Sequence, residues 1–264
     1  MLWVLERMMA KLKWLKADLH VHTVLSPCAE LEMGPKGLVK AALERGLGLL
    51  GITDHNAWAN VPAVVELAQQ YDIGVLPGME VQTREEVHVL CFFPDTKRLV
   101  TAGQQIYAHL PDVCNRADIF GDQIIVDAKE NIIAFEDRML LNSVDLSLEQ
   151  VRDITWENHG IIIPAHVDRP AFSLIANLGF VPPDLKPTAL EISTQVDKET
   201  AMERFPQLKG YTLVTSSDAH RLDDFETTRS TYFYVAAPTL AEIVLACKGL
   251  NNRKVVIASE GTVF

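Results

Sequence analysis

A chain of 264 residues, 48% of them hydrophobic and 22% charged, has the size and composition of one large globular domain. Its formal net charge of −11 at pH 7 argues against broad binding to nucleic acids or anionic membranes, because both need clustered Lys and Arg side chains. The charge does not exclude an anionic substrate held by metal ions, since bound cations dominate the local electrostatic field.

The first residues of the chain are apolar, but Glu6 and Arg7 interrupt the hydrophobic run. The segment is too short and too charged to span a membrane, and it lacks the cleavage pattern of a secretory signal peptide. Apolar residues at helical spacing over positions 5–12 predict a short packing helix, unless translation starts at Met8 or Met9.

The cysteines indicate neither a redox pair nor a zinc knuckle, because no two of them form a C-x-x-C pair. A disulfide framework is not expected at this chain length, and a reducing cytoplasm fits better. The four cysteines are Cys28, Cys91, Cys114 and Cys247.

Short β-rich runs alternate with helical stretches along the whole chain. The first half predicts strands at Ala17–His22, Leu49–Thr53, Ile73–Leu76 and Val87–Phe93, and helices at Pro35–Arg45 and Val61–Tyr71. The second half predicts helices at Leu148–Asn158, Ala171–Leu178, Lys198–Phe205 and Thr239–Lys248, and strands at Ile161–Pro164, Ala189–Ile192, Thr212–Thr215, Ser230–Val235 and Val255–Ile257. This alternation predicts an α/β fold with a parallel sheet, closed or nearly closed into a barrel, and helices packed outside.

A stretch from about residue 101 to residue 145 breaks this alternation. Two short β-like pieces, Gln123–Val126 and Asn131–Phe135, flank a polar turn and predict a small inserted β-hairpin. Long excursions are uncommon in compact domains unless they are functional. We expect one domain over residues 1–264, with the insertion serving either as a substrate lid or as a packing or dimer contact.

Six of the eight histidines stand at or just beyond the end of an apolar strand run. Active sites of parallel barrels are built at the carboxyl ends of their strands, so these residues are expected to converge. Imidazoles beside carboxylates suit Zn, Mn or Fe, and a His-x-His pair on a strand places both rings on one face. The rim residues are His20, His22, His55, His88, His166 and His220, with Asp18, Asp54, Glu80 and Asp218. We expect His109 and His159 on the surface.

Four motifs resemble those of the PHP (polymerase and histidinol phosphatase) family of phosphoesterases. They are Asp-Leu-His-Val-His-Thr at 18–23, Gly-Ile-Thr-Asp-His-Asn at 51–56, Gly-Met-Glu at 78–80 with His88 downstream, and Thr-Ser-Ser-Asp-Ala-His at 215–220. The resemblance covers the chain from about Ala17 to Val235. It implies a distorted (β/α)7 TIM-like barrel that holds two or three divalent metal ions, with Zn, Mn or Fe as candidates.

The resemblance also implies how the ligands are shared among the metals. One metal would be held by His20, His22, Glu80 and Asp218; a second, bridged by Glu80, also by His88 and His166; and a third by His55 and His220.

One position departs from the pattern of the family. Relatives place an Asp or His a few residues after the His-x-His pair, and here Pro27 stands at that position and cannot coordinate a metal. Cys28 or Glu30 could substitute, since a thiolate favours Zn or Fe whereas a carboxylate also suits Mn or Mg. The alternative is that both side chains merely pack or face solvent, so the third site depends on this loop.

The resemblance implies a metal-dependent phosphoric ester hydrolase. We expect it to cleave a small phosphomonoester or nucleotide through a metal-bridging hydroxide. Among the catalytic candidates, Arg169 would contact the phosphate, with Arg221 and Arg229 as weaker candidates. Asp54 would orient a metal-binding imidazole or assist proton transfer, and the first role is preferred.

The expected partner is a small phosphorylated substrate, and neither a membrane nor extended nucleic acid is expected, although a short strand end could enter the metal site. Two other functions stay open. An amidohydrolase-type barrel also begins with His-x-His, but the late Asp-Ala-His and the Gly-Met-Glu favour phosphoester chemistry. A non-catalytic metal- or phosphate-binding regulatory module would explain Pro27. The sequence does not indicate the metal, the oligomeric state or the exact substrate.

Overall fold

A computed structural model describes residues 11–225, 227–259 and 262 of the chain. All but the last two positions of the helix predicted over residues 5–12 lie outside this part, as do Met8 and Met9. None of the helices in the described ranges is both long and apolar enough to cross a membrane.

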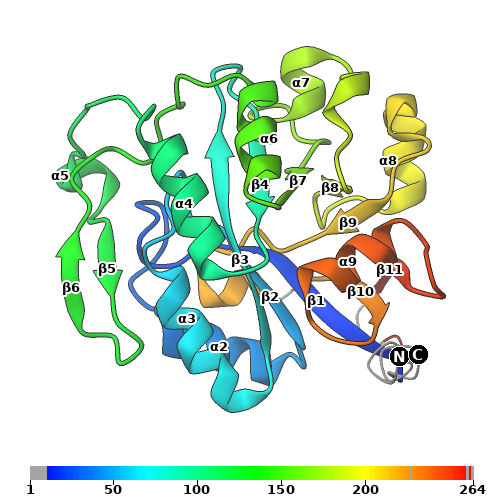
Figure 1. Cartoon of the computed structure of the whole chain (residues 1–264), viewed down its shortest axis with the longest axis horizontal. Coiled ribbons are helices and arrows are strands. Elements are labelled where there is room, and N and C mark those ends of the chain that lie inside the picture. The colour runs from blue at the N-terminus through cyan, green and yellow to red at the C-terminus, as the bar shows by residue number, and fades with distance from the viewer. Residues whose placement is uncertain (1–10, 226, 260–261, 263–264) are drawn as a thin grey trace.

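A curled, mixed sheet of seven strands forms the centre of the molecule (Figure 1). Its strands, in spatial order, are β11 (Lys254–Ser259), β10 (Arg229–Val235), β1 (Lys13–Val21), β2 (Leu49–Ile52), β3 (Gly74–Gln82), β4 (His88–Phe92) and β7 (Ile161–Pro164). A separate parallel pair is formed by β8 (Leu190–Ile192) and β9 (Leu213–Thr215). This pair lies between β7 and β1, because Thr188 N donates to Ile162 O (3.0 Å) and His22 N donates to Ala219 O (3.0 Å).

The α/β class is confirmed, but the all-parallel sheet expected from the sequence is wrong, and a (β/α)7 barrel is not confirmed. Strand β4 runs antiparallel to both β3 and β7, and β10 runs antiparallel to both β1 and β11. Strand β4 pairs antiparallel with β3 because the connection between them is short. Residues 83–87 form a tight turn in which Thr83 N donates to Val87 O, whereas a parallel pair needs a crossover of a dozen residues or more.

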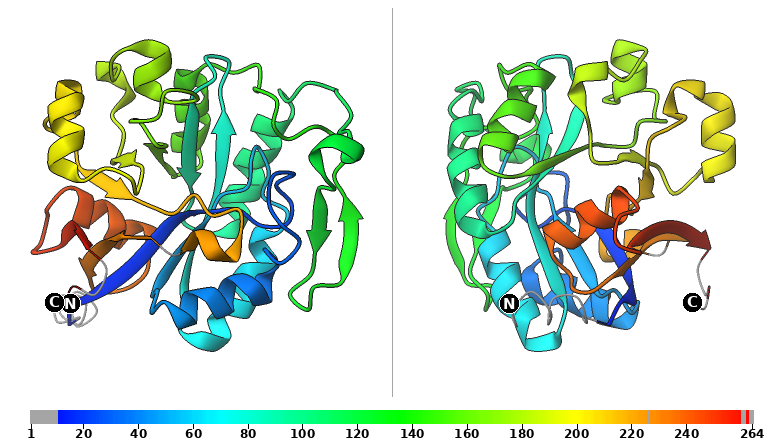
Figure 2. Two further views of the ribbon diagram at one scale, coloured as in Figure 1. Left: turned by 180° about the vertical axis from the view of Figure 1, so that it is seen from behind. Right: turned by 45° about the vertical axis from the view of Figure 1, so that its right-hand side comes forward.

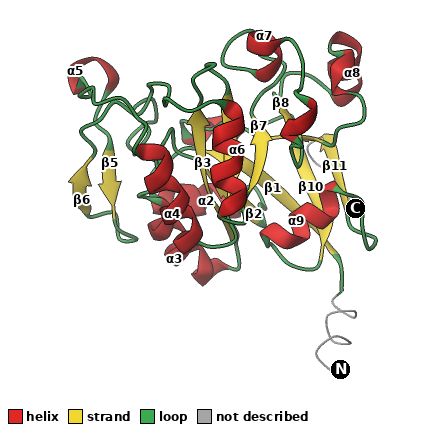
Figure 3. Cartoon of the chain, turned by 45° about the horizontal axis from the view of Figure 1, so that its top comes forward, coloured by secondary structure: helices red, strands yellow, loops and turns green. Residues whose placement is uncertain are grey.

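Among the described helices, four cover the outer surface of the curled sheet (Figure 3), namely α2 (Pro35–Glu44), α3 (Val61–Ala68), α4 (Thr96–Tyr107) and α6 (Leu148–Glu157). Helix α9 (Leu240–Cys247) packs instead against the core that contains Leu90 and Phe92, and the shorter helices are α5 (Ala117–Phe120), α7 (Leu174–Leu178) and α8 (Lys198–Arg204). Local sequence sets where they begin. The hydroxyl of Ser147 accepts from Gln150 N while the Gln150 side chain accepts from Ser147 N, a reciprocal cap that starts α6.

Two apolar cores lie on the two faces of the sheet. In β4, Leu90 and Phe92 belong to the core inside the curl, whereas Val89 and Cys91 pack in the core under the helices. This alternation follows from the period of two in a strand. Because both faces are covered, the strands read as nearly continuous apolar runs, and the polar side chains of the rim stand out against them.

The predicted β-hairpin is present and stands beside the central sheet (Figure 2). It consists of β5 (Ile124–Val126) and β6 (Ile132–Phe135), whose turn is fixed by Asp127 accepting from two backbone amides. Residues 101–107, predicted as part of the insertion, belong to α4. The Asn60 side chain donates to Ile124 O and accepts from Val126 N, which ties β5 to the start of α3.

The close approach of β1 and β2 gives a stability prediction. A Cβ placed on Gly51 would lie 2.5 Å from Leu19 O and 2.8 Å from Leu19 Cα, backbone atoms that cannot move aside. We expect Gly51→Ala to lower the free energy of unfolding by about 1–3 kcal/mol, the usual cost of overpacking, in chemical denaturation. Gly48→Ala is the matched control, because its Cβ would come closest to Leu15 Cδ2, the far end of a flexible side chain, at 3.0 Å. Equal stability of Gly51→Ala and the parent chain would contradict this packing.

Candidate metal centre

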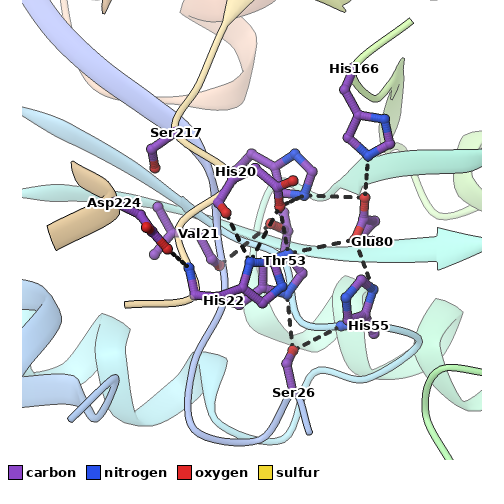
Figure 4. A network of polar contacts seen from close by, with 12 residues as sticks. His20, Val21, His22, Ser26, Thr53, His55, Glu80, His166, Ser217 and Asp224 are labelled. Atoms are coloured by element: carbon purple, nitrogen blue, oxygen red, sulfur yellow. Dashed lines mark hydrogen bonds and ion pairs between the residues drawn. The ribbon is translucent and has the colours of Figure 1, made fainter. Parts of the chain in front are cut away.

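Most of the His and acidic residues predicted to converge lie together at one end of the sheet, and Figure 4 shows His20, His22, His55, Glu80 and His166 among them. His20 lies near the end of β1, His22 follows its last residue, and Glu80 lies near the end of β3. His88 was predicted at the end of its strand but begins β4. It reaches the same rim because β4 runs antiparallel to its neighbours. The loops after β2, β7 and β9 supply His55, His166, Asp218 and His220.

The Glu80 carboxylate is the centre of the cluster. The residue is 1% exposed, and Figure 4 shows His20, His55 and His166 directed toward it. Burial alone would raise the pKa of Glu80, but the charge on His88 and other imidazoles lowers it well below its usual value. Its imidazole neighbours are His55 Nδ1 (2.8 Å), His88 Nδ1 (2.8 Å), His20 Nε2 (3.2 Å), His22 Nε2 (3.5 Å) and His166 Nε2 (3.5 Å).

Asp218 forms a second acidic point of the cluster. Its Oδ1 lies 3.2 Å from Nε2 of both His20 and His22, and its Oδ2 accepts from Arg169 Nη1 at 2.6 Å. Burial lowers the pKa of His22 well below its usual value, as do the neighbouring His220 and His55. The His22 imidazole is therefore neutral, which is the form that binds metals.

The residues present fit divalent cations. In each of three groups of described residues, the ligand atoms lie within 4.8 Å of one another. The groups are His20, His22 and Asp218; His55, Glu80 and His88; and His22, His55 and His220. Several atoms of this cluster are buried and have no hydrogen bond of acceptable geometry among the described residues, namely His20 Nε2, His22 Nε2, Glu80 Oε2 and His166 Nδ1. Buried polar atoms are rarely left without a partner, and coordination to a cation would satisfy these.

Glu191 supports the cluster through hydrogen bonds to His20 and His166. Sequence reasoning had placed this residue only in a strand. Its Oε2 accepts from His20 Nδ1 and from His166 N, both at 3.0 Å, and the residue is 2% exposed. A carboxylate on the second nitrogen of a ligand imidazole fixes the ring and raises its basicity. The signal in the sequence was a charged residue within the apolar strand run Ala189–Ile192.

Asp54 lies one layer behind His22 and is fully buried. Its carboxylate accepts from Thr23 N, from Thr23 Oγ1 and from Ser26 Oγ, each at 2.7 Å. Ser26 Oγ is also 3.0 Å from His22 Nδ1. Burial raises the pKa of Asp54 although these bonds oppose the shift. These contacts favour the orienting role over proton transfer.

A cavity of about 270 Å³ opens beside the cluster, with residues 169–172 as one wall. Arg169 lines it, as the sequence predicted for a phosphate contact, whereas Arg221 and Arg229 pair with Asp224 and Asp197. The helix predicted from Ala171 begins only at Leu174, so residues 171–173 belong to the wall.

Phe172 is a further cavity residue that sequence reasoning missed. Its ring stacks on His88 at 5.1 Å between centroids and an angle of 27°, and the residue is 44% exposed. The backbone has a φ of 53°, a conformation that costs energy in a bulky residue. Strain of this kind is often found at functional sites.

Cys28 lies in the loop after the His-x-His pair and belongs to none of the three groups of ligand atoms found among the described residues. Burial would raise the pKa of its thiol, but hydrogen bonds with His220 and His55 lower it to about 6. The two histidines that we expected on the surface, His109 and His159, are exposed and lie outside the cluster.

Comparisons with known proteins place this geometry in a family. The model of the PHP domain matches residues 18–152, which are 135 of the 264 residues. A 5′-3′ exoribonuclease from Salmonella typhimurium is 35% identical over 78 residues, which are 28% of this chain and 26% of the relative. The chain thus spans about a quarter of that curated relative.

Solved structures show the same fold. The lesion-specific endonuclease from Pyrococcus furiosus superposes with a TM-score of 0.69 at 20% identity, covering 94% of this chain and 59% of the endonuclease. Endonuclease Q in complex with a 27-mer duplex that carries an abasic lesion at the active site superposes with a TM-score of 0.67, also at 20% identity, over 92% of this chain and 58% of that protein.

These matches contradict the partners expected from the sequence. We expected a small phosphorylated substrate and no extended nucleic acid because the chain is acidic. The matched proteins include an exoribonuclease and an endonuclease bound to a DNA duplex, so that expectation is wrong. Net charge sums the whole surface, whereas a metal-lined cavity recognises a phosphate locally.

The position of Glu191 gives a metal-binding prediction. We expect Glu191→Gln to weaken metal affinity by about 10–100-fold, because His20 and His166 lose the carboxylate that orients them. Competition with a chelating dye measures this, and Glu203→Gln on the exposed face of α8 is the control. Unchanged affinity in Glu191→Gln would show that the carboxylate does not support the ligands.

The protonation of His55 predicts how metal binding depends on pH. Burial lowers its pKa, but Glu80 and Cys28 raise it to about 10, so the metal-free imidazole is protonated at pH 7. A metal that takes this nitrogen must displace the proton, so affinity should rise with pH by up to about tenfold per unit and per proton released. Titration calorimetry in buffers of different ionisation enthalpy counts these protons. Binding that releases none between about pH 6 and pH 8 would contradict the assignment.

Proposed function

The chain belongs to the PHP domain family of metal-dependent phosphoesterases, and we propose that it hydrolyses phosphodiester bonds in nucleic acid at the centre around Glu80. The observation that carries the proposal is the set of buried ligand atoms that lack hydrogen-bond partners among the described residues, beside a cavity that Arg169 also lines. The matches to nucleases support nucleic acid as the substrate class. The eight metal ligands inferred from the family belong to this proposal.

Bound divalent ions would supply an activated water and would neutralise charge on the phosphoryl oxygens. His20, His22, Glu80 and Asp218 would hold one ion, and Glu80 would be shared with a second ion on His88 and His166. These ligands come from several different strands and loops, so their geometry is fixed by the fold rather than by one flexible loop. Such preorganisation is what lets fixed charges stabilise a transition state.

Arg169 binds and positions the phosphate in this proposal. Its Nη1 donates to Asp218, and no other described hydrogen bond uses its remaining N–H groups. A guanidinium held by one carboxylate beside a metal centre presents a planar set of donors to a second anion. The side chain is 41% exposed and lines the cavity, so an incoming phosphate can reach it.

Phe172 supplies a surface for a base next to the scissile phosphate. Its ring is exposed on the cavity wall and held by stacking on His88. Proteins that bind single strands stack bases on aromatic rings, because every base has an apolar face. In an acidic chain, this contact and the metal centre replace the long basic track of many nucleic-acid-binding proteins.

A nuclease assay tests the proposal. The purified protein, stripped of metal and reloaded with Mn²⁺ or Zn²⁺, is incubated with end-labelled single-stranded RNA, single-stranded DNA and duplex DNA with an abasic site. We expect cleavage of at least one substrate, its loss with excess chelator, and a decrease of at least about 10²-fold in Glu80→Gln. His109→Asn, in the exposed turn after α4, is the control and should retain activity. Full activity of Glu80→Gln, or no cleavage of any of the three, would contradict the proposal.

A substitution at Phe172 tests recognition of the base. Stacking contributes about 1–3 kcal/mol per base, so Phe172→Leu should raise KM for an oligonucleotide roughly 5- to 150-fold, while Phe172→Tyr retains it. The same bond next to an abasic unit offers no base, and there the two variants should match the parent protein. An equal effect of Phe172→Leu on both substrates would show a structural role instead.

A further inference from the structure

A second cavity, of about 290 Å³, lies where α4 and the β5–β6 hairpin meet the loop before α3 (Figure 1). Of the described residues, none lines both this cavity and the one at the metal centre. The aliphatic side chains of Leu25, Ala57 and Ile125 line it, together with the rings of Trp58 and Tyr107. A mostly apolar and aromatic lining with a few polar groups is typical of a small-molecule site.

Glu136 gives this cavity a fixed hydrogen-bond acceptor. Its Oε1 accepts from the hydroxyl of Tyr107 at 2.7 Å and from Arg138 N at 2.8 Å. Burial, and then the hydrogen bond with Glu136, raises the pKa of Tyr107 to about 12, so the phenol stays protonated and donates. Within the described ranges, no hydrogen bond occupies Oε2 of Glu136 or the side-chain amide of Gln104, which also line the cavity. The cavity therefore offers one carboxylate oxygen and one amide to the edge of a ligand.

We propose that this cavity binds a guanine base. The faces of a purine are apolar and match the aliphatic and aromatic lining, as in proteins that hold a base against aromatic side chains. One edge of guanine carries a ring N–H and an amino group side by side, next to a carbonyl oxygen. The free oxygen of Glu136 accepts from the two nitrogens, and the Gln104 amide donates to the carbonyl oxygen. Adenine and thymine present fewer donors to a carboxylate, so this lining favours guanine.

The cavity is built on the same two loops as the metal centre. Leu25 comes directly before Ser26, whose hydroxyl is 3.0 Å from His22 Nδ1 and accepts from His55 N at 3.2 Å. Trp58 follows His55 by three residues. The guanine has two sources, a base of the substrate strand or a free nucleoside or nucleotide. The inference rests on the proposed function only for the first of these sources.

The hairpin supplies one wall of the cavity. Ile125 lies in β5, and Glu136 directly follows β6. The Asn60 side chain holds β5 in place, because it donates to Ile124 O and accepts from Val126 N, both at 2.9 Å. A wall that is fixed before the ligand arrives lowers the entropic cost of binding. The inserted segment thus acts in ligand binding.

Titration with 2′-deoxynucleosides tests the inference, because these probes have neither a phosphate nor a cis-diol to bind at the metal centre. The purified full chain is titrated with 2′-deoxyguanosine, 2′-deoxyadenosine and thymidine, and binding is measured by calorimetry. We expect saturable binding of 2′-deoxyguanosine, at least about tenfold tighter than that of the other two, because only guanine gives the carboxylate two donors.

A substitution at Glu136 tests the acceptor. Glu136→Gln keeps the oxygen that accepts from Tyr107 but puts a donor in place of the free oxygen. It should weaken 2′-deoxyguanosine binding by about 10–150-fold, the effect of losing a hydrogen bond to a charged group. Glu66→Gln, the same change at an exposed position of α3 outside the cavity, is the control and should bind as the parent does.

Methyl-labelled parent protein gives a second readout that needs no variant to fold. In its NMR spectrum, 2′-deoxyguanosine should shift the methyl resonances of Leu25 and Ile125 and leave those of Ile163, in the core inside the curl, unchanged. No saturable binding, equal affinity for the three probes, unchanged affinity in Glu136→Gln, or shifts that spare Leu25 and Ile125 would each overturn the inference.

Hydrolysis of oligonucleotides distinguishes the two sources of the base. If the base belongs to the substrate strand, replacing guanine with hypoxanthine, which lacks the amino group, should raise KM at one position of the strand alone. If KM does not change at any position, the ligand is the free nucleoside or nucleotide. A protein that binds 2′-deoxyguanosine here but cleaves no nucleic acid would refute the proposed function and leave the guanine site in place.

Discussion

A single buried carboxylate surrounded by imidazoles is the constraint on which the rest of the structure depends. Glu80 is almost fully buried, and five histidines lie within 3.5 Å of its oxygens. An ionised carboxylate in a protein interior costs several kcal/mol unless cations and hydrogen bonds compensate for it. The curled sheet brings the five histidines to the carboxylate from four strand regions, and the same geometry that stabilises Glu80 prepares a site for divalent ions.

Around this centre the chain arranges two kinds of support. Glu191 and Asp54 lie behind the histidines, and each is buried and forms hydrogen bonds with a ligand or with its loop. Arg169 and Phe172 lie on the open side and line the cavity. The metal centre is thus rigid where ions would bind and accessible where a phosphate and a base would enter. This division agrees with the proposed hydrolysis of a nucleic-acid strand.

The sequence predicted most of the centre because its residues share one property: polar side chains that follow or begin apolar runs. What escaped prediction has physical causes. His88 was assigned to the wrong end of its strand, since the short turn at 83–87 reverses β4 and spacing alone does not show direction. Glu191 lies inside a strand rather than at its end. Phe172 was predicted to lie within a helix, but that helix begins only at Leu174. The substrate class was misjudged because net charge says little about a cavity whose lining can hold cations.

Anomalous X-ray diffraction from crystals grown with Mn²⁺ or Zn²⁺ tests the central claim most directly, because it locates ions without reference to activity. The account predicts at least two peaks at the element's absorption edge, both within about 2.0–2.6 Å of Glu80 oxygens or of the surrounding imidazole nitrogens. Crystals that contain the metal in solution but show no anomalous peak at Glu80 would contradict the account, because the buried carboxylate would then be compensated by protonated histidines alone.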